Sequence, residues 1–406
     1  MKLAKIFALL LCFALLAGVF SACTKEPVVE PPLPPSVDDE QKPTYGDEED
    51  DGEELAAFRD LTAEQLMSEM GAGWNLGNTL DAGRREKGTP QQQETAWGNP
   101  VTTPEMIQLL VDTGFNTLRV PVTWQTFIGS APDYEIDEAF MNRVQEVVDY
   151  GIERDLYVIL NLHHEGWHYP SDENYEAAKA QLIAVWAQIA ERFEDYSEKL
   201  IFEGMNEPRG KELEWQGGTD ESRGVINRLN QAFVDTVRAS GGNNSKRWLM
   251  VTTHAASGDA PALNGFEMPS DPSGFTIVSI HAYTPYSFAL NTRSASNEFD
   301  PEDVASTRDI DALFVRLNDH FLSKGIPVVM GETGCLNKDN LEARTAWAAY
   351  YGAVAASYNV PTVWWDNGIR EKHPDRPNEE SFGIMDRNNL EWWYPEIAEA
   401  LVNAFN

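Results

Sequence analysis

Residues 140–162 have the sequence FMNRVQEVVDYGIERDLYVILNL, which joins an amphipathic helix to an apolar strand. The apolar residues of its first half recur at helical spacing on one face: Phe140, Val144, Val147, Val148 and Ile152. The run from Leu156 to Leu162 is short and mostly apolar, as in a parallel strand that is buried on both sides. The segment therefore predicts a helix that packs against a neighbouring strand, which is the repeating unit of an α/β fold.

The same alternation of apolar runs and amphipathic helices extends through residues 58–406. Eight runs qualify as strands: Ala72 to Leu76, Asn116 to Pro121, Leu156 to Leu162, Leu200 to Met205, Trp248 to Thr252, Thr276 to Ile280, Pro327 to Met330 and Thr362 to Trp365. Eight such units in one domain are typical of a barrel rather than an open, doubly wound sheet. The glycines of residues 71–78 (GAGWNLGN) lack the long helix that a phosphate-binding loop needs directly afterwards. We predict an α/β fold, a single (β/α)8 TIM barrel.

Polar and aromatic residues stand at the carboxyl ends of these strands: Arg119, His163, Asn206, Glu207, His281, Tyr283, Glu332 and Trp365. In a barrel those ends converge on one face, where barrel enzymes place their active sites. Taken singly, a histidine is more often a satisfied core group and a tryptophan usually serves packing. Their coincidence favours one functional pocket, because charged groups at the ends of apolar strands cost desolvation free energy.

The motifs around these residues are, in chain order, GWNLGNTLDA, AWGNP, TLRVPVTW, NLHHE, FEGMNEP, HAYTPY, GETG and WWDNG. Together they resemble glycoside hydrolase family 5, and GWNLGNTLDA, AWGNP and NLHHEGWH are similar to its subfamily 4. The resemblance covers essentially all of residues 58–406. It implies a retaining enzyme that cuts internal β-1,4 linkages of a β-glucan and needs no metal or organic cofactor. Cellulose-like glucan, mixed-linkage glucan and xyloglucan all remain open as substrates.

The resemblance also implies roles for single residues. Glu207 matches the family's acid/base and Glu332 its nucleophile, so Glu203, the nearby rival within the strand, is expected to be structural. Asn206 matches a residue that bonds the sugar 2-hydroxyl, and Arg119 matches the arginine beside the nucleophile. The remaining residues implied to contact the substrate are His163, His164, His281, Tyr283, Asn78 and Trp365, the last by stacking on the sugar before the scissile bond.

Two further expectations concern the carboxyls and the tryptophans. Arg119 and the Tyr283 hydroxyl are expected to keep Glu332 ionised, and the charge of Glu332 is expected to raise the pKa of Glu207. Three tryptophans are candidate sugar platforms: Trp97, Trp167 and Trp215. Three others are expected to pack between barrel and helices: Trp186, Trp248 and Trp364.

Two rival functions need consideration. His163, His164, His254 and His281 with a carboxylate would suit zinc in a metal-dependent hydrolase, but Arg119 and Asn206 have no purpose around a metal. A glycan-binding protein without catalysis would have lost Glu207 or Glu332, and both are present.

The charge balance limits the partners. The chain has 65 Asp and Glu against 31 Lys and Arg, a net charge of −34 at pH 7. Nucleic acid binding depends on clustered Lys and Arg, so we exclude that class of ligand and expect a neutral polysaccharide. We expect a monomer.

The first residues predict export. Lys2 and Lys5 precede an apolar stretch from Ile6 to Phe20 that is too short to span a membrane comfortably, and Ser21-Ala22-Cys23 follows. This pattern resembles a bacterial lipobox, which would make residues 1–23 a lipoprotein signal peptide with Cys23 as the lipidated residue; the alternative is a plain signal peptide. We expect residues 24–57, rich in Pro and acidic residues, to be a disordered tether. The protein would then be anchored at the cell surface, the outer membrane or in the periplasm.

Overall fold

The computed structural model describes residues 58–83, 86–376 and 378–406. The expected signal peptide, the lipidation site at Cys23 and the tether up to residue 57 lie outside these residues. Among the described residues, no helix is both long and apolar enough to cross a membrane.

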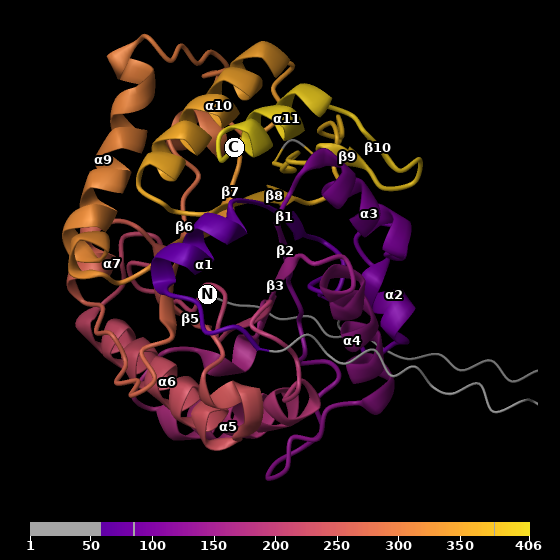
Figure 1. The fold of residues 1–406 in the computed structure, drawn as a ribbon, viewed down its shortest axis with the longest axis vertical. Coiled ribbons are helices and arrows are strands. Elements are labelled where there is room, and N and C mark those ends of the chain that lie inside the picture. The colour runs from indigo at the N-terminus through magenta and orange to yellow at the C-terminus, as the bar shows by residue number, and fades with distance from the viewer. Residues whose placement is uncertain (1–57, 84–85, 377) are drawn as a thin grey trace, which may run out of the picture. The chain divides into compact units, whose positions relative to one another are not determined.

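Eight parallel strands form a closed barrel in chain order, in which each strand pairs with the next and β8 pairs with β1 (Figure 1). The strands are β1 (Ala72–Leu76), β2 (Thr117–Val120), β3 (Tyr157–Asn161), β4 (Leu200–Glu203), β5 (Leu249–Ser257), β6 (Thr276–His281), β7 (Val328–Thr333) and β8 (Thr362–Asp366). The predicted (β/α)8 barrel and all eight predicted strands are confirmed. The strand β5 runs on to Ser257, five residues past the predicted end, after a shift in its pairing with β6.

Helices surround the barrel, as Figure 1 shows for α4, α5, α6, α9 and α10. The helices are α1 (Ala63–Met70), α2 (Pro90–Glu94), α3 (Pro104–Thr113), α4 (Glu138–Ile152), α5 (Tyr175–Arg192), α6 (Asp220–Ala239), α7 (Ala260–Asn264), α8 (Tyr286–Ala289), α9 (Val304–His320), α10 (Leu341–Ser357) and α11 (Pro395–Asn403). Three 3-10 turns, η1 (Gly166–His168), η2 (Gly242–Ser245) and η3 (Leu322–Lys324), and a short pair of strands, β9 (Met385–Asp386) with β10 (Glu391–Trp392), complete the fold.

Local sequence explains where helix α3 begins and ends. The Thr103 side chain accepts a hydrogen bond from the backbone N–H of Met106, and Pro104 occupies the first helical position, where no N–H is needed. Gly114 follows the helix with a φ of 102°, a left-handed conformation that suits glycine. The chain can then turn directly into β2.

Buried apolar residues close the barrel at the amino ends of its strands. At the amino ends of the strands, Leu66, Met67 and Met70 of α1 pack in one buried cluster with interior residues such as Ile159 and Val329. This helix closes that end, so only the carboxyl ends remain available for a cleft. The tryptophans expected to pack, Trp186, Trp248 and Trp364, are all buried.

Candidate active site

The floor of the site is built around the guanidinium of Arg119, which is fully buried on β2. Its Nη1 donates to Glu332 Oε1 at 2.8 Å and to Asn75 Oδ1 at 2.9 Å, and its Nη2 donates to Asn206 Oδ1 at 2.7 Å. Its Nε donates to Glu203 Oε2 at 2.8 Å. One planar cation thus ties together four side chains, from β1, from β4 and the residues after it, and from β7, and it sets the position of the Glu332 carboxylate.

Glu203 lies beneath the site as a structural carboxylate. It is fully buried and accepts hydrogen bonds from Arg119, from Asn161 Nδ2 at 3.0 Å and from the Ser279 hydroxyl at 2.6 Å. Burial alone would raise its pKa, but the charge of Arg119 and the hydrogen bonds lower it to about 2. This surrounding agrees with the structural role expected for Glu203.

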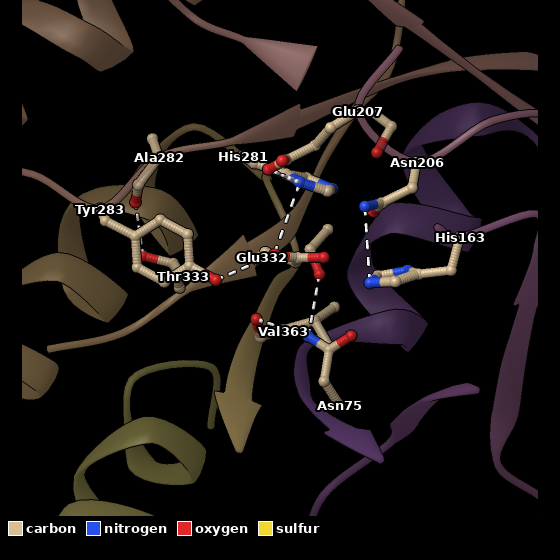
Figure 2. Close-up of polar contacts among 12 residues, drawn as sticks. Asn75, His163, Asn206, Glu207, His281, Ala282, Tyr283, Glu332, Thr333 and Val363 are labelled. Carbon is tan, nitrogen blue, oxygen red and sulfur yellow. Dashed lines mark hydrogen bonds and ion pairs between the residues drawn. The ribbon is translucent and has the colours of Figure 1, made fainter. Parts of the chain in front are cut away.

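Glu207 and Glu332 lie on either side of His281, as Figure 2 shows. His281 Nδ1 is 2.9 Å from Glu207 Oε1 and 3.6 Å from Glu332 Oε2. The Tyr283 hydroxyl donates to Glu332 Oε2 at 2.9 Å, so both oxygens of that carboxyl have a protein partner. The structure therefore brings together the two carboxyls that the motifs singled out, with Arg119 and Tyr283 beside the second.

The charges of the pair differ from what the motifs led us to expect. Burial raises the pKa of Glu332, and the charge of Glu207 raises it further. The pKa of Glu207 is lowered despite its burial, because the hydrogen bond with His281 and the charge of Arg209 favour the carboxylate. Arg119 and Tyr283 lower the pKa of Glu332, as expected, but burial and the charge of Glu207 outweigh them, and the pKa of Glu207 is lowered rather than raised. The deciding contact is His281, which lies closer to Glu207 than to Glu332.

His281 is a cation at neutral pH. Burial lowers its pKa, but the charge of Glu332 and the contacts with Glu203 and Glu207 outweigh burial and raise that pKa to about 9. With Arg119, it places two basic groups among three carboxyls, so the charge of Glu207 and the charge of Glu332 each affect the protonation of the other.

A second wall of the site carries His163 and Trp365. Their rings stack at a centroid distance of 5.6 Å and an angle of 3°. Asn161 donates its amide to His163 Nδ1 at 3.1 Å, because its own oxygen accepts from the Val122 N–H. On the other side of the ring, His163 Nε2 lies 3.5 Å from the Asn206 amide nitrogen (Figure 2).

The loop after β1 brings Asn78 to the same wall. Gly77 is required there, because a Cβ at this position would lie 2.9 Å from the Trp365 ring. Asn78 itself has a φ of 57°, and its N–H donates to Asp81 Oδ2 at 3.0 Å. The ring centre of His164 lies 4.4 Å from that of His163 and 5.8 Å from that of Trp97.

These residues line one cleft of about 1440 Å³. The site residues predicted from the sequence that line it are Asn78, His163, His164, Asn206, Glu207, His281, Tyr283, Glu332 and Trp365, and Arg119 lies beneath it. Two of the candidate platforms, Trp97 and Trp215, also line the cleft. The third, Trp167, does not; its indole N–H donates to the buried Glu165 at 2.6 Å.

Two groups of described residues have ligand atoms close enough together for a cation: Asp81 with His163 and His164, and Glu207 with His281 and Glu332. Several of these atoms already serve hydrogen bonds within the protein. The two oxygens of Asp81 accept from the backbone of Asn78 and Thr79, and His163 Nδ1 accepts from Asn161. His254, the fourth histidine of the rival zinc hypothesis, belongs to neither group.

Sequence reasoning missed Asn75 and Asn161, which orient Arg119 and His163 from within β1 and β3. A signal was available, since each is a polar residue inside an otherwise apolar strand. Cys335, three residues past Glu332, is fully buried, and burial raises its pKa to about 12. It therefore stays a neutral thiol.

We expect Trp365→Ala to lower kcat/KM on a long glucan by about tenfold or more, the equivalent of about 1.4 kcal/mol, because the sugar loses a stacking surface. Trp364→Ala is the matched control. It removes a buried ring and should cost about 3 to 5 kcal/mol of unfolding free energy. Thermal unfolding and kinetics of both variants check this prediction, and a folded Trp365→Ala enzyme with normal activity would remove Trp365 from the substrate site.

Comparisons with known proteins agree with this geometry. The family model described as cellulase, glycosyl hydrolase family 5, matches residues 81–371. The chain is 47% identical to the cellulase/esterase CelE of Acetivibrio thermocellus over 352 residues, which are 86% of this chain but only 41% of that protein. It is 48% identical to endoglucanase 1 of Ruminococcus albus, over 83% of this chain and 80% of the other.

Solved structures give the same picture. A GH5-4 broad specificity endoglucanase from Ruminococcus champanellensis with bound cellotriose is 48% identical, with a TM-score of 0.81 over 85% of this chain and 99% of that one. A GH5 family lichenase from Caldicellulosiruptor sp. F32 is 38% identical, with a TM-score of 0.80 over 86% of this chain and 96% of that one.

Proposed function

Because this chain belongs to the cellulase family, glycosyl hydrolase family 5, we propose that it is a retaining endo-β-1,4-glucanase that acts by double displacement. The observation that supports this most directly is the Glu332 carboxyl, held by Arg119 and Tyr283 and facing Glu207 across His281. All these groups come from one chain, so we propose a monomer.

In the first step, a Glu332 oxygen attacks the anomeric carbon and forms an ester while the bond from that carbon to the glycosidic oxygen breaks. Glu207 gives its proton to the leaving oxygen. This step needs a proton on Glu207 and a Glu332 carboxylate, the opposite of the preference that their pKa shifts indicate in the free site. His281 lies within 3.6 Å of both carboxyls, where it can pass a proton from Glu332 to Glu207.

In the second step, Glu207 is a carboxylate and removes a proton from water, whose oxygen attacks the anomeric carbon and displaces Glu332. Two inversions restore the β configuration. Arg119 and Tyr283 stabilise the released Glu332 carboxylate through the same hydrogen bonds that oriented it for attack.

We propose that the enzyme hydrolyses more than one kind of β-glucan. The candidates are cellulose-like glucan, mixed-linkage glucan and xyloglucan. Similar proteins are described as a broad specificity endoglucanase and as a lichenase, which supports this breadth. Within this chain, Trp97 and Trp215 line the cleft and remain 42% and 56% exposed, so their rings offer stacking surfaces that need no particular hydroxyl pattern.

One experiment tests the proposed function. The purified protein is incubated with soluble cellulose, mixed-linkage glucan and xyloglucan, with and without an excess of EDTA. We expect internal cleavage of at least one β-glucan, initial release of the β-anomer and no loss of rate with EDTA. Initial release of the α-anomer would exclude double displacement, and a loss restored by zinc would favour the metal-dependent rival.

We also propose that Cys23 carries a lipid anchor that holds the enzyme at a bacterial membrane. The support is the apolar segment that ends in Ser21-Ala22-Cys23. Cys23→Ala should move active enzyme from the membrane fraction to the soluble fraction with unchanged kcat. A variant that stays with the membrane, in cells whose wild-type protein takes up no labelled lipid, would contradict the anchor.

A further inference from the structure

Arg209 connects the acid/base to an exposed aromatic ring. Its Nη1 donates to the Glu207 backbone oxygen at 3.1 Å and to Glu207 Oε2 at 3.4 Å. Its Nε donates to Glu214 Oε1 at 2.9 Å, and its guanidinium lies 4.4 Å from the ring centre of Trp215. One face of the Trp215 ring therefore rests on the same cation that touches Glu207.

The place of Trp215 in the barrel indicates which part of the substrate it would contact. Trp215 follows β4, whereas Trp365 belongs to β8, and β4 lies opposite β8 in the closed barrel of eight strands. If the sugar attacked by Glu332 stacks on Trp365, the saccharide that leaves lies toward β4, where Glu207 and Trp215 are. Asp259 and Arg316 line the cleft at that end together with Trp215.

We propose that Arg209 is a positioning residue that couples stacking of the leaving saccharide on Trp215 to proton donation by Glu207. The inference rests on the proposed function, because it needs Glu207 as the acid. Arg209 makes no contact with substrate in this role; it acts through the two side chains that it holds.

The two oxygens of Glu207 have different partners, which explains how the coupling works. Oε1 is 2.9 Å from His281, whereas Oε2 has only the longer contact with Arg209 at 3.4 Å. Oε2 is thus the oxygen that can carry the proton and turn to the leaving group. As that proton moves to the glycosidic oxygen, Oε2 becomes part of a carboxylate, and the adjacent guanidinium stabilises the new charge.

Other charged groups act on Glu207 from the surrounding elements. His281 and Tyr283 face it from β6 and beyond, Glu332 from β7, His164 from the segment after β3, and Glu380 from the segment after β8. All of these stay in place when Arg209 alone is changed. A shift in the pH profile after that change therefore reports the loss of one positive charge beside Glu207.

The test compares two substrates. Dinitrophenyl β-cellobioside has a leaving group that needs no proton and places no sugar on Trp215, whereas a β-glucan oligosaccharide needs both. We expect Arg209→Met to lower kcat/KM on the oligosaccharide by about tenfold to a hundredfold and to leave kcat/KM on the aryl substrate within about twofold. The basic limb of the oligosaccharide pH profile should rise by about half a pH unit to one unit.

Two further variants separate charge from shape. Arg209→Lys keeps the positive charge but loses the planar fork, so the pH limb should stay in place while the oligosaccharide remains a poorer substrate. Trp215→Ala should lower oligosaccharide turnover alone, and combining it with Arg209→Met should cost less than the two single losses together, as expected for coupled residues. Arg316→Met removes a cation from the same end of the cleft without contact with Glu207, and it should leave the pH limb unmoved.

Equal losses on both substrates with an unmoved pH limb would overturn the coupling and make Arg209 a purely structural residue. Fully additive losses of oligosaccharide turnover in the variant that combines Arg209→Met with Trp215→Ala would overturn the coupling as well. If Arg209→Met does not fold, Arg209→Lys tests the coupling instead. The measurement is then the ratio of its kcat/KM on the oligosaccharide to its kcat/KM on the aryl substrate. Failure of the proposed function would look different, because the unmodified enzyme would then cleave neither substrate, release the α-anomer first or lose its activity with EDTA.

Discussion

Replacing Glu332 by glycine should lower glucan hydrolysis by on the order of 10⁶-fold, because the only group placed to form the covalent ester is gone. Arg119 and Tyr283 would remain to bind a small anion in the vacated space. Added azide should therefore attack the anomeric carbon of an activated β-glycoside from the Glu332 side. The expected product is an α-glycosyl azide, identified by NMR.

The matched control is Glu380→Gln, since Glu380 is another carboxyl that lines the cleft. This variant should still hydrolyse glucan without azide. Hydrolysis by Glu332→Gly at a normal rate, or a β-azide product from it, would place the nucleophile on a different residue.

Replacing Glu207 by alanine should lower kcat/KM on glucan by about 10²- to 10⁴-fold, the usual contribution of a general acid. The loss should vanish on dinitrophenyl β-cellobioside, whose leaving group needs no proton. On that substrate the ester at Glu332 still forms but decays slowly without a base. Azide should then intercept it from the opposite face and give the β-glycosyl azide.

A burst of dinitrophenol followed by slow turnover provides a second measurement for the same variant. Asn206→Ala is the neighbouring control: it should weaken both steps on every substrate and give no azide product. If the two glutamate variants gave the opposite azide anomers, the roles assigned to Glu207 and Glu332 would have to be exchanged.

The strands of this fold could be predicted because their information is local. Each strand from Ala72 to Trp365 is a short apolar run between amphipathic helices, and burial of both faces of a parallel strand imposes that composition. The end of β5 was missed by five residues, because the run to Ser257 depends on a shift in its pairing with β6 rather than on its own composition.

The site residues could be predicted for a related reason. A parallel barrel brings the carboxyl ends of its strands to one mouth, so polar residues at those ends meet whatever their separation in sequence. Trp167 shows the limit of this reasoning. It belongs to the same segment after β3 as His164, but its indole N–H bonds to Glu165 and the residue does not line the cleft.

The sequence by itself determined the barrel, because the strands follow from composition and order, and its motifs singled out the two carboxyls through their resemblance to a known family. Only the tertiary structure decided how the site is charged and connected. The pKa values of Glu207 and Glu332 depend on the 2.9 and 3.6 Å distances to His281, and the link from Glu207 to Trp215 depends on where one guanidinium lies. Electrostatic interactions vary with distance and burial, which no one-dimensional pattern of residues contains.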